Sequence, residues 1–282
     1  MGNNTRDIKR RITSVKSIQQ ITKAMEMVAA AKLRRAQVNV IAARPYTTKL
    51  AQVMSRIIMA GNDASSPLLE AKDGPPAYIV IAADRGLSGA YNANVLRFAR
   101  ETIQENPGPV TVIGRKAKEF MGKRGFELIG EYGLKFEDPT YNDAASILAP
   151  LFSNFDLGIF GSLHMIYTEF TSVLSHKPQI MQLLPVIGLG QEEAGPSLYL
   201  YEPSPEAVLD NLLPRYITSL LYQGLLEAKA SELGAQRTAM KSATDNADEV
   251  IDKLTLSYNR ARQTAITQEI LEVVNGAQAL EG

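Results

Sequence analysis

Apolar residues recur at helical spacing along the first segment of the chain. Its regular apolar positions are Ile8, Ile12, Val15, Ile18, Ile21, Met25 and Val28. Successive positions are three or four residues apart, close to the period of a coiled coil. No proline occurs before Pro45, and Gly61 follows the segment. The pattern predicts an N-terminal coiled-coil helix over residues 1–60, kinked or broken at Pro45.

A second long helix is expected at the other end, over residues 204–282. Ser204 is a suitable N-cap, and Pro205 suits the first helical position. The later apolar or small positions are Met240, Ala243, Ala247, Val250, Leu254, Tyr258, Ala261 and Ala265. Their mean spacing is near one helical turn, so one face stays in line. A helix of about 75 residues is about 110 Å long, so it must project from any globular part, and we expect it to pair antiparallel with residues 1–60.

The middle segment, residues 75–200, alternates between short apolar runs and helical patterns. The expected strands cover 77–83, 110–113, 126–129, 162–170 and 178–186. The expected helices cover 91–105, 115–124 and 141–155. This alternation predicts partly parallel pairing, and the last two strands are expected to pair across a polar link, 171–177. The predicted fold class is α/β: a Rossmann-like α/β domain with a mixed sheet, joined to a long antiparallel two-helix coiled coil.

Charge divides unevenly along a chain that has 30 basic and 30 acidic residues and a formal net charge of zero. Residues 1–56 hold twelve basic and two acidic residues, a net charge of +10, whereas 57–201 and 202–282 each carry −5. The neutral total argues against a general nucleic-acid binder. The basic arm by itself is compatible with a transit peptide or a membrane-surface helix, and its charge also fits pairing with residues 202–282.

Several kinds of chemistry are not expected. The chain has no cysteine, which excludes disulfides, thiolate metal sites and cysteine nucleophiles. No run of about 18 apolar residues predicts a membrane span. His164 and His176 are the only histidines, and neither has a second ligand at metal-binding spacing. No serine lies in a nucleophile-elbow sequence, so a hydrolase triad is not expected either.

A glycine-containing turn, residues 83–89, follows the first expected strand and precedes a helix. Such a turn can hold phosphate through backbone N–H groups, but its sequence matches neither common phosphate-binding motif. It is therefore either a structural turn or protein contact, or a nucleotide site. Arg260, Arg262 and Gln263 are either a solvated helix face or donors to a partner's carboxylates. The methionines that are either core or partner-facing are Met25, Met27, Met54 and Met59.

Five longer motifs together carry a family resemblance. They are Ile21 to Ala30 (ITKAMEMVAA), Ala83 to Asn92 (ADRGLSGAYN), Leu198 to Pro205 (LYLYEPSP), Met240 to Ala247 (MKSATDNA) and Tyr258 to Glu269 (YNRARQTAITQE). In this order, and over nearly the whole chain, they resemble the gamma subunit of rotary ATP synthases of the bacterial type. The set is far more specific than any single glycine pattern.

The resemblance implies a shaft that is not itself an enzyme. In that family the two terminal helices form an antiparallel coiled coil inside a ring of three alpha and three beta subunits. The globular domain lies beside the epsilon subunit, on the membrane ring of c subunits. Ion flow turns the c ring and the shaft, which drives the beta subunits through their nucleotide-binding conformations. The implied protein has no catalytic residue and no cofactor, is present once per complex, and meets the membrane only through the c ring.

The resemblance also implies contact residues, where the motifs match. The positions that match contacts with the lower levers of the beta subunits are Lys23, Met25 and Glu26. The positions that match the upper contact with beta are Arg262, Gln263 and Thr267. The positions that match the foot near the c ring are Leu200, Tyr201 and Glu202. The motif-loop positions are Asp84 and Arg85, for which a structural role with contact to beta is expected. At Gln236 and Arg237 an arginine is shifted by one place from the family pattern, so no contact is carried over there.

The family resemblance narrows the location of the protein. The chain lacks the cysteine-bearing insert of chloroplast relatives, and its motifs begin near residue 6, which leaves no room for a transit peptide. We expect a bacterial protein bound peripherally on the cytoplasmic side of the inner (plasma) membrane. The alternatives are an α/β nucleotide-binding enzyme with helical oligomerisation arms, and a coiled-coil adaptor or membrane tether.

Overall fold

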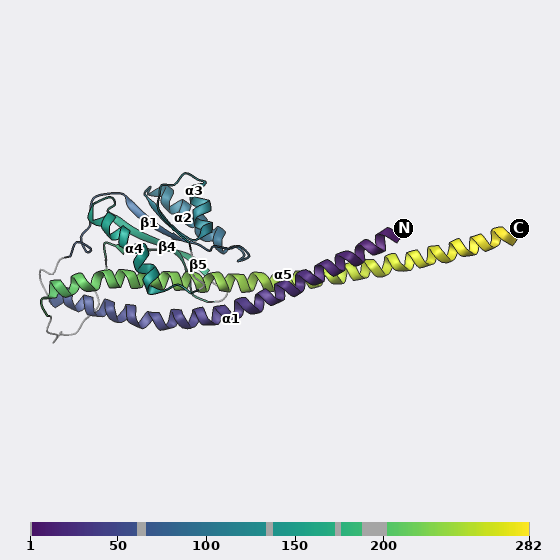
Figure 1. The fold of residues 1–282 in the computed structure, drawn as a ribbon, viewed down its shortest axis with the longest axis horizontal. Helices are drawn as coiled ribbons and strands as arrows, with labels where there is room; N and C mark the ends of the chain where they lie inside the picture. The colour runs from purple at the N-terminus through teal and green to yellow at the C-terminus, as the bar shows by residue number, and fades with distance from the viewer. Residues whose placement is uncertain (1, 61–65, 134–137, 173–175, 188–201, 282) are drawn as a thin grey trace. The chain divides into compact units, whose positions relative to one another are not determined.

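The computed structural model describes residues 2–60, 66–133, 138–172, 176–187 and 202–281, and the chain divides into two compact units. The first unit combines Met1–Ala29 with Arg237–Gly282, and the second comprises Ala30–Gln236. Helices α1 (Gly2–Ala60) and α5 (Pro205–Glu281) each contribute to both units (Figure 1). The two long helices and the α/β segment between them are confirmed.

A mixed sheet forms the centre of the second unit. Its strands, in the described part of the chain, are β1 (Pro76–Ile81), β2 (Val110–Ile113), β3 (Leu128–Tyr132), β4 (Ser162–Phe170) and β5 (His176–Leu184). They lie in the order β3-β2-β1-β4-β5. β1 runs parallel to β2 and β4, and β2 runs parallel to β3, whereas β4 and β5 are antiparallel. The predicted mixed sheet with a final strand pair is therefore confirmed.

The bounds of β1, β3 and β5 differ from the predicted strands, and the starts of β3 and β5 show a physical reason. β3 begins later than residue 126, because the N–H of Phe126 bonds to the Met121 carbonyl oxygen and closes the preceding helix. β5 begins at His176, inside the predicted polar link, and its pairing with β4 places Lys177 opposite Glu169. Opposite charges at facing positions stabilise an antiparallel pair, which favours the longer strand.

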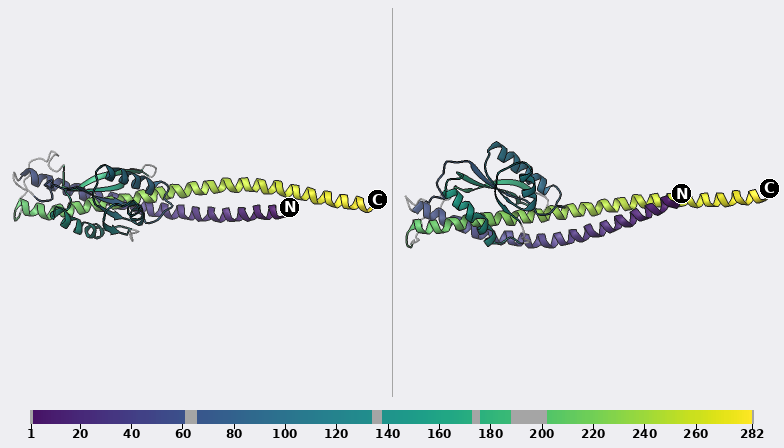
Figure 2. Two further views of the ribbon diagram at one scale, coloured as in Figure 1. Left: turned by 90° about the horizontal axis from the view of Figure 1, so that it is seen from above. Right: turned by 45° about the horizontal axis from the view of Figure 1, so that its top comes forward.

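Helices cover both faces of the sheet. The three short helices are α2 (Tyr91–Glu105), α3 (Arg115–Gly122) and α4 (Tyr141–Asp156). Successive strand residues point to opposite faces. Val80 therefore packs with α2 and α3, whereas Ile79 and Ile81 pack with α4 and the first part of α5. Figure 2 shows the second unit, with its sheet and covering helices, from two further directions.

Two helix starts follow directly from local sequence. At α4, Thr140 and Asp143 form a reciprocal capping box. At α5, the Ser204 hydroxyl accepts a hydrogen bond from the Ala207 N–H at 3.2 Å, which confirms the predicted N-cap. A side-chain hydrogen bond with Ser204 also lowers the pKa of Glu206 in the first turn. The start of α5 therefore matches the sequence prediction.

Helix α1 continues through Pro45, so of the two predicted outcomes, a kink or a break, the break does not occur. An interior proline costs about 3 kcal/mol, because it removes a backbone hydrogen bond and crowds the preceding turn. Buried residues on both sides of the proline offset that cost. Before it, α1 packs on α5 through two sets of residues: Leu33, Ala36 and Val40, against Leu226, Ala230 and Leu233. After it, the core residues of α1 are Leu50, Met54 and Ile57.

Candidate functional site: the helix pair and the motif loop

Polar residues occupy the contact between α1 and α5 in the first unit. The Thr22 and Thr244 hydroxyl oxygens lie 2.8 Å apart, and the Gln19 amide donates a hydrogen bond to the Asp248 carboxylate. These pairs confirm that the two helices run antiparallel. Thr244 also bonds back to the Met240 carbonyl oxygen, so it is fixed within its own helix.

This polar contact turns several apolar side chains of α1 outward. Ile8, Ile12 and Val15 are half-buried, as the helical pattern predicts. Beyond them the buried position moves by one residue, to Gln19 and Thr22, and three apolar residues of the predicted seam face away. These residues, which we call the outer stripe, are Ile18, Ile21 and Val28, with exposed fractions of 52%, 59% and 55%. An exposed apolar stripe of this kind is typical of a partner-binding surface.

The predicted lever-contact residues of α1 lie beside the outer stripe. Lys23 is exposed, whereas Met25 and Glu26 are half-buried in the free chain. Met25 continues the spacing of the outer stripe between Ile21 and Val28, so its exposed part belongs to the same face. Lys23 shares a different side of the helix with Met27, which is exposed. The described residues therefore present both an apolar and a basic side of α1.

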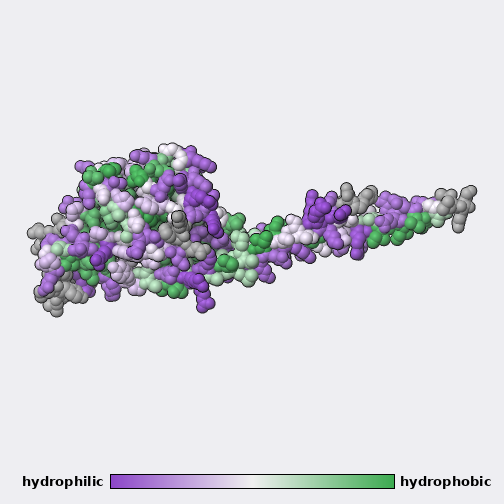
Figure 3. Space-filling model, in the orientation of Figure 1, coloured by the Kyte–Doolittle hydropathy of each residue, from purple (hydrophilic) through white to green (hydrophobic). Residues whose placement is uncertain are grey.

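The end of α5 has no partner residues level with it in α1. Because Thr22 lies opposite Thr244, one residue back along α1 matches one residue forward along α5, which puts Gly2 level with about residue 264. Beyond that point α5 presents an apolar tip, the exposed residues Ile266, Ile270, Leu271, Val273 and Val274. Hydrophobic side chains line this part of the helix in Figure 3.

The predicted upper-contact residues lie at the start of this apolar tip. Arg262, Gln263 and Thr267 are all exposed. The Thr267 hydroxyl bonds to the Gln263 carbonyl oxygen at 2.9 Å, one turn earlier in the same helix. The arginine and glutamine side chains are thus on the surface, where donors to a partner's carboxylate must be. Of the predicted foot residues, Leu200 and Tyr201 lie outside the described residues, and Glu202 is exposed.

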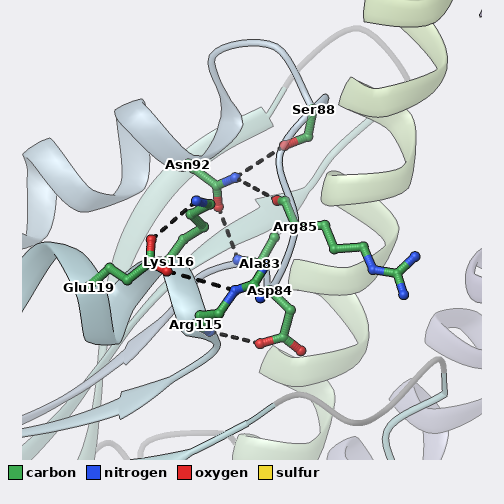
Figure 4. A network of polar contacts seen from close by, with 8 residues as sticks. All are labelled: Ala83, Asp84, Arg85, Ser88, Asn92, Arg115, Lys116 and Glu119. Carbon is green, nitrogen blue, oxygen red and sulfur yellow. Dashed lines mark hydrogen bonds and ion pairs between the residues drawn. The ribbon is translucent and has the colours of Figure 1, made fainter.

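The motif loop after β1 is held together by its own side chains (Figure 4). The Asn92 amide oxygen accepts from the Ala83 N–H at 3.0 Å, and its NH₂ group donates to the Arg85 carbonyl oxygen and the Ser88 hydroxyl, both at 3.2 Å. Asp84 accepts a 2.7 Å hydrogen bond from the Arg115 N–H at the start of α3. One asparagine therefore closes the loop, and one aspartate ties it to the next helix.

This arrangement gives the turn a structural role, and it occupies one N–H group at the start of the turn that a bound phosphate could otherwise use. Backbone N–H groups that cradle a phosphate must point at it unoccupied. Here Asn92 and Asp84 occupy the N–H groups of Ala83 and Arg115. The loop instead displays two residues outward. The Arg85 guanidinium points away from the network in Figure 4, and Leu87 is 62% exposed at a φ of 66°.

His164, on β4, is held by contacts within the α/β part of the second unit. His164 bonds to the Ser162 hydroxyl at 3.1 Å and packs on Tyr78, and burial lowers its pKa. Within the described ranges, no three His, Asp or Glu side chains are grouped so as to hold a metal ion. In the same ranges, no helix has the length and apolar character needed to cross a membrane.

Comparison with known proteins shows the family. The family described as ATP synthase matches residues 4–280. The ATP synthase gamma chain of Heliobacterium modesticaldum is 50% identical and that of Desulforamulus reducens 48% identical, over at least 98% of each chain. The chain belongs to the ATP synthase gamma chain family. This confirms the resemblance carried by the five sequence motifs.

Solved structures show that this gamma chain shares the fold of distant relatives. A chain of the Euglena gracilis mitochondrial ATP synthase is 20% identical, with a TM-score of 0.70 over 99% of this chain and 95% of that chain. A chain of the Tetrahymena thermophila mitochondrial central stalk and c ring is 22% identical, with a TM-score of 0.61 over 79% and 99%.

Two features of this gamma chain were not evident from its pattern of apolar residues. The apolar pattern places the outer stripe in the helix seam, because Ile18 and Ile21 keep the coiled-coil spacing. The signal that separates them is the polar pair Gln19 and Thr22, whose spacing matches Asp248 and Thr244. The second feature is Tyr91, at the end of the ADRGLSGAYN motif, whose hydroxyl reaches α5.

Proposed function

We propose that this gamma chain is the central stalk of a rotary ATP synthase. It turns with the c ring and couples ion flow across the membrane to ATP synthesis or hydrolysis in the beta subunits. The observation that carries the proposal is the surface of the first unit. Its antiparallel helices leave an outer stripe on α1 and an apolar tip on α5, which the chain does not cover itself. Because the chain belongs to the ATP synthase gamma chain family, we expect other subunits of that synthase to cover them.

A stalk must impose different states on chemically identical partners. A partner changes conformation only if the stalk contacts its states with different free energies. The helix pair offers unlike faces for this purpose: the apolar outer stripe, the basic side around Lys23, and the exposed Arg262 and Gln263. A beta subunit that contacts one of these faces is therefore driven towards a different conformation from the beta subunit that contacts another.

We assign contact roles to the positions that match the family motifs. Lys23, Met25 and Glu26 meet the lower beta-subunit levers, and we assign the upper beta contact to the end of α5. The residues of that upper contact are Arg262, Gln263 and Thr267. Leu200, Tyr201 and Glu202 form the foot contact with the c ring. Asp84 holds the motif loop, and Arg85 is its outward contact residue toward beta.

The proposed assembly contains three alpha and three beta subunits, an epsilon subunit and a c ring around one copy of this chain. Catalysis belongs to the beta subunits, and this chain contributes no reacting group. The bacterial sources of the gamma chains named above support a position on the cytoplasmic side of the plasma membrane. The chain is held there through the c ring.

Single-molecule rotation tests this function. We expect a bead fixed to this chain, assembled with immobilised alpha and beta subunits, to turn in one direction on addition of ATP. The control is the same assembly without ATP, in which the bead is expected only to fluctuate. The purified chain alone is expected to show no ATP turnover, because catalysis is assigned to beta. Sustained turnover by the chain alone, or an assembled bead that only fluctuates after ATP is added, contradicts the proposal.

A further inference from the structure

Three residues of α5 form a close seam with the α/β part of the second unit. They are Gly224, Ala228 and Ser231, spaced by four and three residues, so they lie on one side of the helix. The other side of the same turns packs on α1 through Leu226, Ala230 and Leu233. Helix α5 is thus held from two directions at this level of the second unit.

Gly224 permits the closest approach in this seam. A Cβ atom at this position would lie 2.4 Å from the Sδ atom of Met165 and 2.6 Å from its Cε atom. Met165 lies on β4 and is fully buried, so its side chain fills the space that a larger residue would need. Glycine costs a helix interior roughly 0.5–1 kcal/mol relative to alanine, and here it lets β4 pack directly against the helix.

The other two seam residues receive or make hydrogen bonds between elements. The Tyr91 hydroxyl, at the start of α2, donates to the Ala228 carbonyl oxygen at 3.1 Å. The Ser231 hydroxyl donates to the Thr168 carbonyl oxygen of β4 at 3.2 Å. Tyr91 and Ser231 are both buried, so water does not compete for these bonds.

These contacts resist a motion that apolar packing alone resists weakly. Burial of apolar surface is non-directional, so a helix in an apolar groove can turn or slide at modest cost. Hydrogen bonds require particular distances and angles, and they are lost when the helix turns about its axis. The space left by the missing side chain of Gly224, which we call the notch, also opposes sliding. If the helix slid, a neighbouring residue with a Cβ atom would take the place of Gly224 and meet Met165.

We propose that Gly224, Tyr91 and Ser231 form a torsional clamp, which makes the α/β part and α5 turn as one body. The inference rests on the proposed function, since only a rotating stalk needs such a connection. It gives the tyrosine of the ADRGLSGAYN motif a positioning role within this chain. Torque that enters at the α/β part then reaches α5 with little twist between them.

The torsional stiffness of the assembled complex tests the clamp. The chain has no cysteine of its own, so the substitution Gln104→Cys on α2 provides one exposed attachment point for a bead. With the alpha and beta subunits immobilised, the angular variance of the bead during catalytic pauses is inversely related to stiffness. Rotation of this complex under ATP tests the proposed function, and the variance tests the clamp, so the two fail separately.

The first variant removes both hydrogen bonds. Tyr91→Phe/Ser231→Ala is expected to raise the angular variance at least about twofold, because two directional contacts are lost from the seam. Its matched control is Tyr78→Phe/Ser219→Ala. Tyr78 bonds to the Asn106 carbonyl oxygen within the α/β part, and Ser219 bonds back within α5, so this control removes similar bonds but no tie between them. Equal variance in the two variants, with both complexes rotating, overturns the clamp.

The second variant changes the notch. Gly224→Ala forces Met165 aside and is expected to raise the variance, whereas Gly276→Ala, in the same helix, meets nothing within 4 Å and is expected to leave it unchanged. This pair decides the question if the first variant does not assemble. A Gly224→Ala complex that rotates with the variance of the Gly276→Ala complex overturns the clamp.

Discussion

At the scale of single residues, one asparagine does most to shape the motif loop. Asn92 uses both ends of its amide: the oxygen accepts one bond, and the nitrogen donates two. An aspartate is acceptor-only at neutral pH, so it can keep the first bond and lose the other two. The loop geometry therefore depends on the amide and not merely on a polar side chain of this size.

We therefore expect Asn92→Asp to lower the free energy of unfolding of the chain by about 1–3 kcal/mol, as two acceptors lose their donor and face a new negative charge. Urea unfolding followed by circular dichroism measures this change. Asn94→Asp is the matched control, because Asn94 is in the same helical turn but uses its amide only as an acceptor, from Arg97. Equal loss in both variants would show that charge, and not the lost donors, is responsible.

At the scale of elements, the helix pair separates the roles of two apolar sets that share one spacing. Ile12 and Val15 are half-buried in the seam, whereas Ile18 and Ile21 are exposed in the outer stripe. The change occurs where Gln19 and Thr22 take the positions facing α5. The seam set therefore stabilises the free chain, and the outer set is available to a partner.

This separation predicts that replacing apolar residues with glutamine affects stability in the seam and torque in the outer stripe. Ile12→Gln/Val15→Gln is expected to destabilise the free helix pair by roughly 1–2 kcal/mol, because both substitutions remove apolar surface that is half-buried in the seam. Ile18→Gln/Ile21→Gln is expected to leave the unfolding midpoint nearly unchanged, but to lower the torque of the assembled motor. Unfolding curves and stalled-bead torque measure the two effects. An outer-stripe variant with full torque contradicts the proposed lever contact.

How far the sequence predicted these elements depends on what fixes each one. The bounds of α2 and β2 were predicted to the residue, because Asn106-Pro107-Gly108 and Gly114 punctuate the chain there. The start of β5 was misjudged, because pairing with β4 extends it into polar residues. The outward turn of Ile18 was also missed, since spacing along one helix does not show which face its partner helix takes.

At the scale of the whole molecule, the neutral net charge conceals a strongly basic arm. Residues 1–56 carry +10, and the rest of the chain carries −10. The Gln19–Asp248 and Thr22–Thr244 pairs show that the arm binds α5 through neutral donors as well as through apolar residues. Arg44 of the arm also forms an ion pair with Glu227 of α5 at 3.5 Å, so opposite charges contribute to the pairing. Exposed basic residues such as Lys23 remain available to acidic partners.

The apolar tip of α5 gives a prediction that concerns assembly and not folding. Ile270 is exposed in the free chain, so Ile270→Asp is expected to change the free energy of unfolding by no more than about 0.5 kcal/mol. In the complex, a partner that covers the tip would bury the new carboxylate without a counter-charge, which is costly. We therefore expect the yield of assembled complex, measured by gel filtration with the alpha and beta subunits, to fall several-fold.

Asn275→Asp is the matched control, because it adds the same charge about 140° around the helix from Ile270, at an exposed polar position. Equal assembly of the Ile270→Asp and Asn275→Asp chains would contradict burial of the apolar tip, whereas selective loss for Ile270→Asp would place the partner on this side of the helix.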